Sequence, residues 1–336
     1  MRAAVTDASG FVVAEVPDPA PGPGELVLRV AANGICGSDL SMAPFLPAGT
    51  IMGHEFAGEV VAVGPDDPDV EHCFRPGDTA AAMPVIGCHR CRACLTGDLA
   101  RCTSARTLGL GVLPGALAEF VVVGAHESVP LDGVDTADGA LVEPLAVGLH
   151  AVTRAAVRPG DRALVLGAGP VGLAVLHWLS RGVATEVVCS DPSPGRRTAA
   201  LDVGASSVCT PDDLTGHVGP GFDLVIECVG KPGMIAAAVD AVTSSGRVVV
   251  AGVCLGDDTF MPVAGVVKET TMHFVSYYTR DEFVTAAAEL RKGAIGSSAL
   301  VSEIVGFEEV DRVFAELSTP NNHRKVLISP AVTSVG

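Results

Sequence analysis

The stretch Gly34-Ile35-Cys36-Gly37-Ser38-Asp39-Leu40, with Gly53-His54-Glu55-Phe56-Ala57-Gly58-Glu59 shortly after it, decides how the chain is organised. These two glycine-flanked turns offer one thiolate, one imidazole and one carboxylate. A catalytic zinc takes that mixture of ligands when one coordination position stays open for substrate. Alone, Cys36 is typical of a small buried hydrophobe and His54 of a structural histidine. Their joint presence with Glu55 predicts a catalytic zinc site.

A second cysteine cluster follows, at Cys88, Cys91, Cys94 and Cys102. Four thiolates at this spacing can close a tetrahedron around one ion within a single lobe, which we place at residues 84–104. Such a closed set predicts a structural zinc, because no position is left for substrate. An iron–sulfur cluster uses similar ligands and remains an alternative.

The third motif is the glycine-rich segment Gly167-Ala168-Gly169-Pro170-Val171-Gly172. It follows the apolar strand pattern of residues 163–166 and precedes the apolar helix pattern of residues 173–179. That context predicts a dinucleotide loop, in which the glycines allow close backbone approach and the helix N-terminus faces the pyrophosphate. Asp191 ends the next predicted strand, where a carboxylate can bind the ribose hydroxyls and repel a 2′-phosphate. The loop therefore predicts NAD(H), with NADP(H) the less favoured cofactor.

Asp39 has a role that follows from the chemistry of metal sites. A histidine that ligates a metal usually donates its other ring N–H to a carboxylate, which fixes the tautomer and the ring orientation. Asp39 lies in the cysteine turn, so we expect it to accept from His54. Its alternative is a local cap on the turn.

The chain changes character part-way along. Short strand patterns with Gly/Pro turns fill the first part and predict a compact barrel-like β domain. From Arg158 on, strand and helix patterns alternate, which predicts a parallel sheet in an α/β fold. We therefore expect a catalytic, zinc-binding domain at residues 1–150 and 285–336, and a nucleotide-binding domain at residues 151–284.

Composition excludes several function classes. The 336 residues carry a net charge of −17, which would repel a nucleic-acid backbone. No apolar run is long enough to cross a membrane, and no signal-peptide core precedes the first strand. We expect a cytoplasmic protein, with its clustered cysteines used for metal rather than for disulfides.

Over nearly its whole length the sequence resembles the zinc-dependent medium-chain alcohol, polyol and threonine dehydrogenases, through the motifs quoted above. The resemblance implies a GroES-like β-barrel-type catalytic domain and a Rossmann, doubly wound nucleotide-binding domain. In that family the position of Glu143 supplies, or lies beside, the third protein ligand of the catalytic metal, and Glu55 competes for it. Ser38 matches a hydroxyl that begins a proton relay, and Arg196 matches an arginine that packs beside the adenine.

The combined prediction is an enzyme with two zinc ions per chain that transfers a hydride between NAD(H) and a secondary alcohol, a polyol or the matching ketone. One alternative is a biosynthetic dehydrogenase or reductase of a larger metabolite, such as a cyclitol, a sugar or a natural-product intermediate. The other is a redox-inactive nucleotide-binding protein.

Two further expectations come from the resemblance. It implies a homodimer or homotetramer, paired through residues 271–277 or the segment near Phe260. Ser41 departs from the polyol branch, where many relatives have a histidine at this position, so the far end of the proton relay is open.

Overall fold

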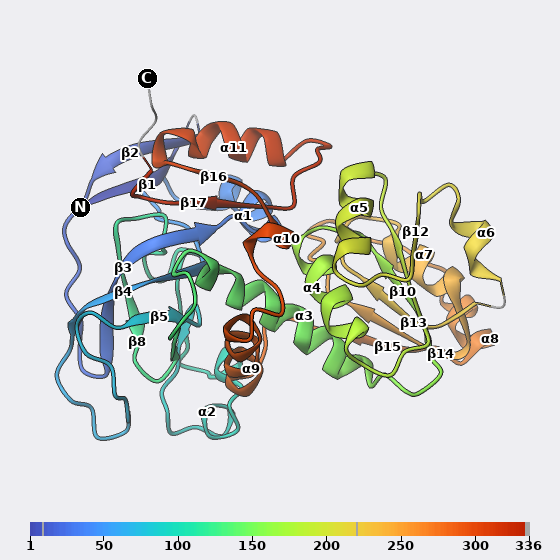
Figure 1. Cartoon of the computed structure of the whole chain (residues 1–336), viewed down its shortest axis with the longest axis horizontal. Helices are drawn as coiled ribbons and strands as arrows, with labels where there is room; N and C mark the ends of the chain where they lie inside the picture. Colours follow the sequence, from blue (N-terminus) through green and yellow to red (C-terminus); the bar gives the residue numbers. More distant parts are fainter. Residues whose placement is uncertain (9, 220, 333–336) are drawn as a thin grey trace. The chain divides into compact units, whose positions relative to one another are not determined.

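The computed structural model describes residues 1–8, 10–219 and 221–332, and it divides the chain into two units (Figure 1). Unit 1 comprises residues 1–143, 278–320 and 325–336, and unit 2 comprises residues 144–277 and 321–324. The boundaries differ from the predicted ones at 150/151 and 284/285. Helix α3 (Val142–Ala155) explains the first difference, because one continuous helix starts in unit 1 and runs through unit 2.

Unit 1 is built on a seven-stranded mixed sheet. Its strands follow the order β16 (Val301–Val305), β17 (Lys325–Ile328), β3 (Glu25–Gly34), β4 (Glu55–Val63), β5 (Thr79–Ala82) and β9 (Ser128–Pro130), with β8 (Phe120–Gly124) paired to β3. Two small sheets complete the strands: β1 (Arg2–Asp7) with β2 (Gly10–Glu15), and β6 (Val85–Ile86) with β7 (Arg106–Thr107).

Short helices connect these strands. They are α1 (Gly37–Met42), η1 (Ala43–Phe45), α2 (Arg92–Leu95), η2 (Leu99–Arg101), η3 (Asp138–Leu141), α9 (Arg280–Arg291), α10 (Ser297–Leu300), η4 (Phe307–Glu309) and α11 (Val310–Leu317). The C-terminal segment returns to the N-terminal one, since Phe314 and Ile328 share a buried cluster with Ala4 and Met52. Residues of α11 and β17, which we expect in the catalytic domain, thus pack with the N-terminal strands.

Unit 2 contains a six-stranded sheet whose neighbouring strands all pair in parallel. The strand order is β12 (Ser207–Cys209), β11 (Glu186–Ser190), β10 (Arg162–Leu166), β13 (Phe222–Glu227), β14 (Val242–Val250) and β15 (Thr271–Phe274). Its helices are α4 (Pro170–Ser180), α5 (Pro194–Asp202), α6 (Leu214–Val218), α7 (Met234–Ala241) and α8 (Pro262–Lys268). This is the doubly wound order in which the chain starts at β10 and reverses direction, with ligands bound beyond the carboxyl ends of the strands.

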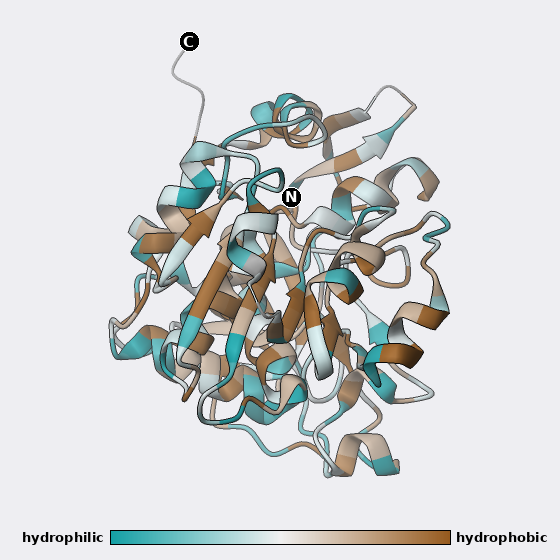
Figure 2. Cartoon of the chain, turned by 90° about the vertical axis from the view of Figure 1, so that its right-hand side faces the viewer, coloured by the Kyte–Doolittle hydropathy of each residue, from teal (hydrophilic) through white to brown (hydrophobic). Residues whose placement is uncertain are grey.

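The strands of this sheet read as apolar runs because both of their faces are covered. Leu164, Val188, Val225 and Val248 lie in one buried cluster. Figure 2 shows these strands in the brown of hydrophobic residues. Among the described residues, no helix combines the length and the apolar character needed to cross a membrane.

Candidate metal centres and nucleotide loop

The two predicted ligand turns meet because β3 and β4 pair antiparallel. Gly34, at the end of β3, lies opposite Glu55, at the start of β4. Cys36 follows β3 and is the N-cap of α1, while His54 immediately precedes β4. The Cys36 thiol, the His54 imidazole and the Glu55 carboxylate therefore reach the same end of the strand pair, although Cys36 and Glu55 are 19 residues apart in sequence.

The donor atoms of Cys36, His54 and Glu55 lie within 4.8 Å of one another, which is close enough for one metal ion. The Asp39 carboxylate contacts both the cysteine turn and the histidine turn. One of its oxygens accepts the Cys36 backbone N–H at 2.9 Å, and the other lies 3.1 Å from His54 Nδ1. Because Nδ1 faces the carboxylate, Nε2 is left for a metal.

The electrostatics of His54 reflect the same arrangement. Burial of the ring lowers the pKa of His54, but Asp39 and Cys36 outweigh burial and raise that pKa well above its usual range. The surroundings of the imidazole therefore favour a positive charge. A divalent cation on Nε2 would supply such a charge.

Ser38 also lies at this centre. Its Oγ is 3.4 Å from His54 Nε2, the ring nitrogen that points away from Asp39. Ser41 does not extend the arrangement, since its hydroxyl donates to the Gly37 carbonyl one turn back at 3.1 Å.

Glu55 has a partner that the sequence analysis missed. Lys325 Nζ donates to both Glu55 oxygens, at 2.7 and 2.5 Å, and to the Ile35 carbonyl at 2.9 Å. Both side chains are almost fully buried, at 2% and 1% exposure. Glycine at position 34 leaves space for the Glu55 side chain, because the Cβ of any other residue there would lie 2.2 Å from a Glu55 oxygen. The sequence did offer a sign of this partner, because Lys325 is the one charged residue of an otherwise apolar strand.

Glu143 lies in the first turn of α3 and is buried. Burial, and next the negative charge of Glu55, raise the pKa of Glu143 to about 7. The structure thus places Glu143 within electrostatic reach of Glu55 but outside the group formed by Cys36, His54 and Glu55. Three buried carboxylates, those of Asp39, Glu55 and Glu143, lie at this centre with the basic side chains of Lys325 and His54. A zinc ion there would favour the ionised form of Glu143.

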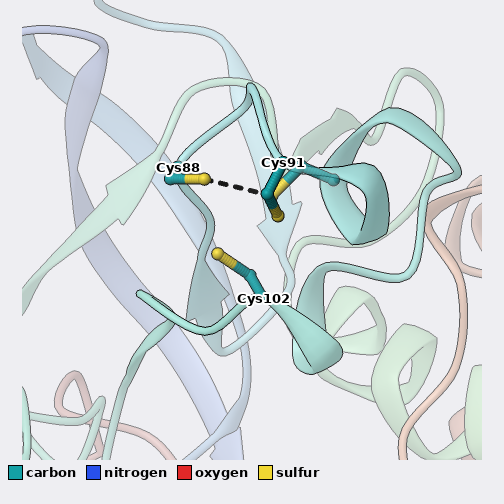
Figure 3. Close-up of side chains that lie close together, drawn as sticks. Cys88, Cys91 and Cys102 are labelled. Atoms are coloured by element: carbon teal, nitrogen blue, oxygen red, sulfur yellow. Dashed lines mark hydrogen bonds between the residues drawn. The ribbon is translucent and has the colours of Figure 1, made fainter.

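The four clustered cysteines converge as predicted. Their sulfur atoms all lie within 4.8 Å of one another, and Figure 3 shows Cys88, Cys91 and Cys102 turned toward a common point. The Cys91–Cys94 and Cys88–Cys94 sulfur distances are 3.6 and 4.0 Å. A tetrahedron with Zn–S bonds of about 2.3 Å has edges of about 3.8 Å. The set fits a single ion, whereas an iron–sulfur cluster places inorganic sulfide between its thiolates and needs wider spacing.

Two thiols of this lobe differ in acidity. Backbone N–H donors of Arg90 and Cys91 lower the pKa of Cys88 to about 6, whereas burial raises the pKa of Cys94 to about 12. All ten cysteines of the chain are free. The lobe is therefore held by no disulfide, and its thiols are available for an ion.

In unit 2, β10 leads into the predicted glycine loop and α4 opens with Gly169 as its N-cap. Gly167 has a φ of 93°, and a Cβ on Gly172 would lie 1.9 Å from the Gly167 carbonyl oxygen. No atom lies within 4 Å of where a Cβ of Gly169 would sit. The loop is thus tight on its inner side and open above Gly169, where a pyrophosphate would approach.

Asp191 follows β11 and reaches back to this loop. One carboxylate oxygen accepts the Ala168 N–H at 2.8 Å, and the other accepts the Ser193 N–H at 2.8 Å. Arg196 is engaged elsewhere, because it donates to the His323 carbonyl and to the Asn321 side chain. Arg197 donates to the carbonyls of Asp191 and Pro192.

Comparison with known proteins identifies the family of the chain. Residues 22–133 match the alcohol dehydrogenase GroES-like domain, and residues 170–292 match the zinc-binding dehydrogenase model. L-arabinitol 4-dehydrogenase of Aspergillus oryzae is 32% identical over 325 residues, 89% of this chain and 84% of that protein. The chain belongs to the zinc-binding dehydrogenase family.

This dehydrogenase is similar to others of the family along most of its length. (R,R)-butanediol dehydrogenase of Bacillus subtilis is 30% identical over 341 residues, 95% of this chain and 96% of that protein. A crystal structure from Sinorhizobium meliloti, described as a zinc-binding dehydrogenase bound to NADP, superimposes with a TM-score of 0.87. It is 28% identical and covers 98% of this chain and 99% of that one.

These similarities confirm the predicted family, the GroES-like and Rossmann fold, and an oxidoreductase that uses zinc and a nicotinamide cofactor.

Proposed function

We propose that this dehydrogenase transfers a hydride between NAD(H) and a secondary hydroxyl of a small, uncharged polyol or diol. The observation that supports it is the convergence of Cys36, His54 and Glu55 donors within 4.8 Å, with the Ser38 hydroxyl 3.4 Å from His54 Nε2. The named activities of the two relatives, on L-arabinitol and on (R,R)-butanediol, favour the same substrate class.

Bound zinc would act as a Lewis acid that lowers the pKa of the alcohol, and NAD⁺ would accept the hydride. We assign Cys36, His54 and one carboxylate as the residues that hold the metal. Asp39 fixes the His54 ring so that Nε2 faces it. Ser38 stands beside that atom, where its hydroxyl can accept the proton that the substrate alcohol releases and pass it on.

The carboxylate ligand is the point at which two candidates compete. Glu55 lies in the donor group, but Lys325 binds both of its oxygens. Glu143 lies outside that group, and burial together with the negative charge of Glu55 raises its pKa to about 7. We propose that either can complete the metal set, and that Lys325 neutralises the carboxylate that is not bound.

We propose NAD as the preferred cofactor. Asp191 is held beside the glycine loop by the Ala168 and Ser193 amides, where its charge would oppose a 2′-phosphate. Arg196 and Arg197 are both occupied by carbonyl or amide oxygens, which argues against a phosphate role for either. The NADP bound to the Sinorhizobium meliloti protein makes cofactor preference a necessary measurement.

We also propose a second, structural zinc on Cys88, Cys91, Cys94 and Cys102, which gives two ions per chain. Ten free cysteines and two thiolate-containing metal sets suit a reducing compartment, so the cytoplasm is the proposed location.

A homo-oligomer is the proposed assembly. β15 is the edge strand of the parallel sheet, and Phe274 on it is 68% exposed. Val266 and Val267 on the preceding helix α8 are 73% and 76% exposed. An open sheet edge beside exposed apolar side chains is a surface suited to pairing with a second copy. Light scattering on the purified enzyme tests it, and a monomer would overturn it.

A substrate panel tests the proposed reaction. The purified enzyme would be assayed for NAD⁺ reduction with small diols, linear polyols, cyclitols and simple alcohols, and each active substrate would be repeated with NADP⁺. We expect turnover of secondary alcohols with NAD⁺ preferred. Turnover restricted to bulky metabolites would favour the biosynthetic alternative, and the absence of any turnover by a protein that binds NAD and two zinc ions would favour the redox-inactive one.

A further inference from the structure

One fully buried carboxylate of unit 1 has no part in the reaction described above. Glu127 lies in the turn between β8 and β9 and is 0% exposed. Its carboxylate contacts the segment that enters the cysteine lobe. A fully buried carboxyl group calls for a function, because burying it is costly.

The contacts of Glu127 flank the first cysteine of the lobe. Glu127 Oε1 accepts the Gly87 backbone N–H at 2.9 Å, and the same oxygen lies 3.6 Å from His89 Nε2. Gly87 and His89 are the residues on either side of Cys88. One carboxylate oxygen thus fixes the backbone before this cysteine and faces the side chain after it.

Gly124 allows the close approach of Glu127, and Gly87 allows the close approach of Cys94. A Cβ on Gly124 would lie 2.0 Å from Glu127 Oε2, and a Cβ on Gly87 would lie 2.9 Å from the Cys94 sulfur. Glu127 Oε2 has no hydrogen-bond partner in the part of the chain that the structure describes. Burying this carboxylate therefore destabilises the fold, and its contacts with the lobe offset part of that cost.

Other contacts hold the lobe from the same direction. Arg280 donates its Nε–H to the His126 carbonyl at 2.7 Å and its backbone N–H to the Gly97 carbonyl at 2.8 Å. The rings of His126 and His89 meet edge to face, with centroids 5.1 Å apart. The β8–β9 turn therefore contacts the start of the cysteine segment, and the start of α9 contacts the turn at Gly97, between Cys94 and Cys102.

We propose that Glu127 is an outer-shell anchor of the lobe's zinc, which holds Cys88 in place for the ion and slows its loss. Binding of a metal by a small loop costs the entropy of ordering its ligands, and a ligand whose flanking backbone is already fixed costs less. Outer-shell partners of metal ligands typically change metal affinity about 10- to 100-fold. The inference rests on the structural zinc proposed above.

The test follows zinc release from the purified holoenzyme to a chromophoric chelator, with total zinc counted beforehand. Glu127→Gln keeps an oxygen for the Gly87 amide but removes the charge that faces His89, and Glu127→Ala removes both. We expect one of the two ions to leave about 10- to 100-fold faster in Glu127→Ala and by a smaller factor in Glu127→Gln. The other ion should leave at the wild-type rate.

Ser128→Ala is the matched control. It removes a buried hydroxyl that donates to the Gly124 carbonyl in the same turn and does not touch the lobe, so release should stay at the wild-type rate. Equal release from Glu127→Gln, Glu127→Ala and wild type would overturn the inference, as would faster release of both ions or of one ion from Ser128→Ala. A wild-type enzyme without zinc on the four cysteines would instead refute the proposed lobe site itself.

Discussion

Replacing Lys325 by Met tests the electrostatics of the catalytic centre. The lysine makes three hydrogen bonds, two of them to Glu55, and both side chains are almost wholly buried. Removing one partner of a buried ion pair typically costs about 3–5 kcal/mol, because the other charge is left without compensation. Methionine fills a similar volume, so little of the loss should come from packing.

In the Lys325→Met variant, the Glu55 carboxylate can avoid an unpaired buried charge by binding a proton. That costs about 1.4 kcal/mol for each pH unit above the ordinary glutamate pKa of about 4.3, so about 4 kcal/mol at pH 7 and about 1 kcal/mol at pH 5. In the variant the folded protein then holds one proton more than the unfolded chain, so its stability falls as the pH rises from 5 to 7. The difference from wild type should therefore be several-fold larger at pH 7.

Urea unfolding of metal-free wild type and variant, at both pH values, measures this difference. Glu55→Gln combined with Lys325→Met removes both charges and should recover most of the lost stability, which makes a double-mutant cycle with Glu55→Gln alone. Zinc should reduce the penalty of Lys325→Met, because the ion provides another positive charge. A penalty that is equal at both pH values, with no recovery in the double variant, would refute the assigned pairing.

Two further substitutions test the other assigned roles. Asp191→Ala should raise the KM for NAD⁺ about 10-fold or more and reduce discrimination against NADP⁺. The substitution removes both the ribose acceptor and the charge that opposes a 2′-phosphate. An unchanged ratio of the kcat/KM values for the two cofactors would contradict that assignment. Ser38→Ala should lower kcat about 100-fold, within the range for a lost proton-transfer group, while the zinc content and the NAD⁺ affinity stay at wild-type values. Wild-type turnover by Ser38→Ala would remove the serine from the proton relay.

Much of this site could be predicted from sequence because its signals are local. Cys36 with Asp39, and the four cysteines of the lobe, each lie within one short segment, and the glycine loop needs only its strand and helix context. The strand and helix patterns of unit 2 repeat with clear periods, so the parallel sheet followed from them.

Contacts between distant segments were missed. Lys325 and Glu55 are 270 residues apart in sequence, and their ion pair depends on the pairing of β17 with β3 and of β3 with β4. Glu127 accepts a hydrogen bond from Gly87, 40 residues earlier in sequence, and it lies in a turn whose conformation no local pattern predicts. The predicted boundary at 150/151 and the division between the units at 143/144 both fall inside α3, whose sequence carries no break.

We propose that Cys36, His54 and a carboxylate hold a catalytic zinc that is distinct from the zinc of the cysteine lobe. Counting zinc per chain in wild type and in Cys36→Ser, with NAD⁺ binding measured on the same samples, tests this assignment. We expect two ions in wild type, one in the variant, turnover only in wild type, and similar NAD⁺ affinity in both. Two ions retained by Cys36→Ser, or NAD⁺ binding lost with the ion, would contradict it.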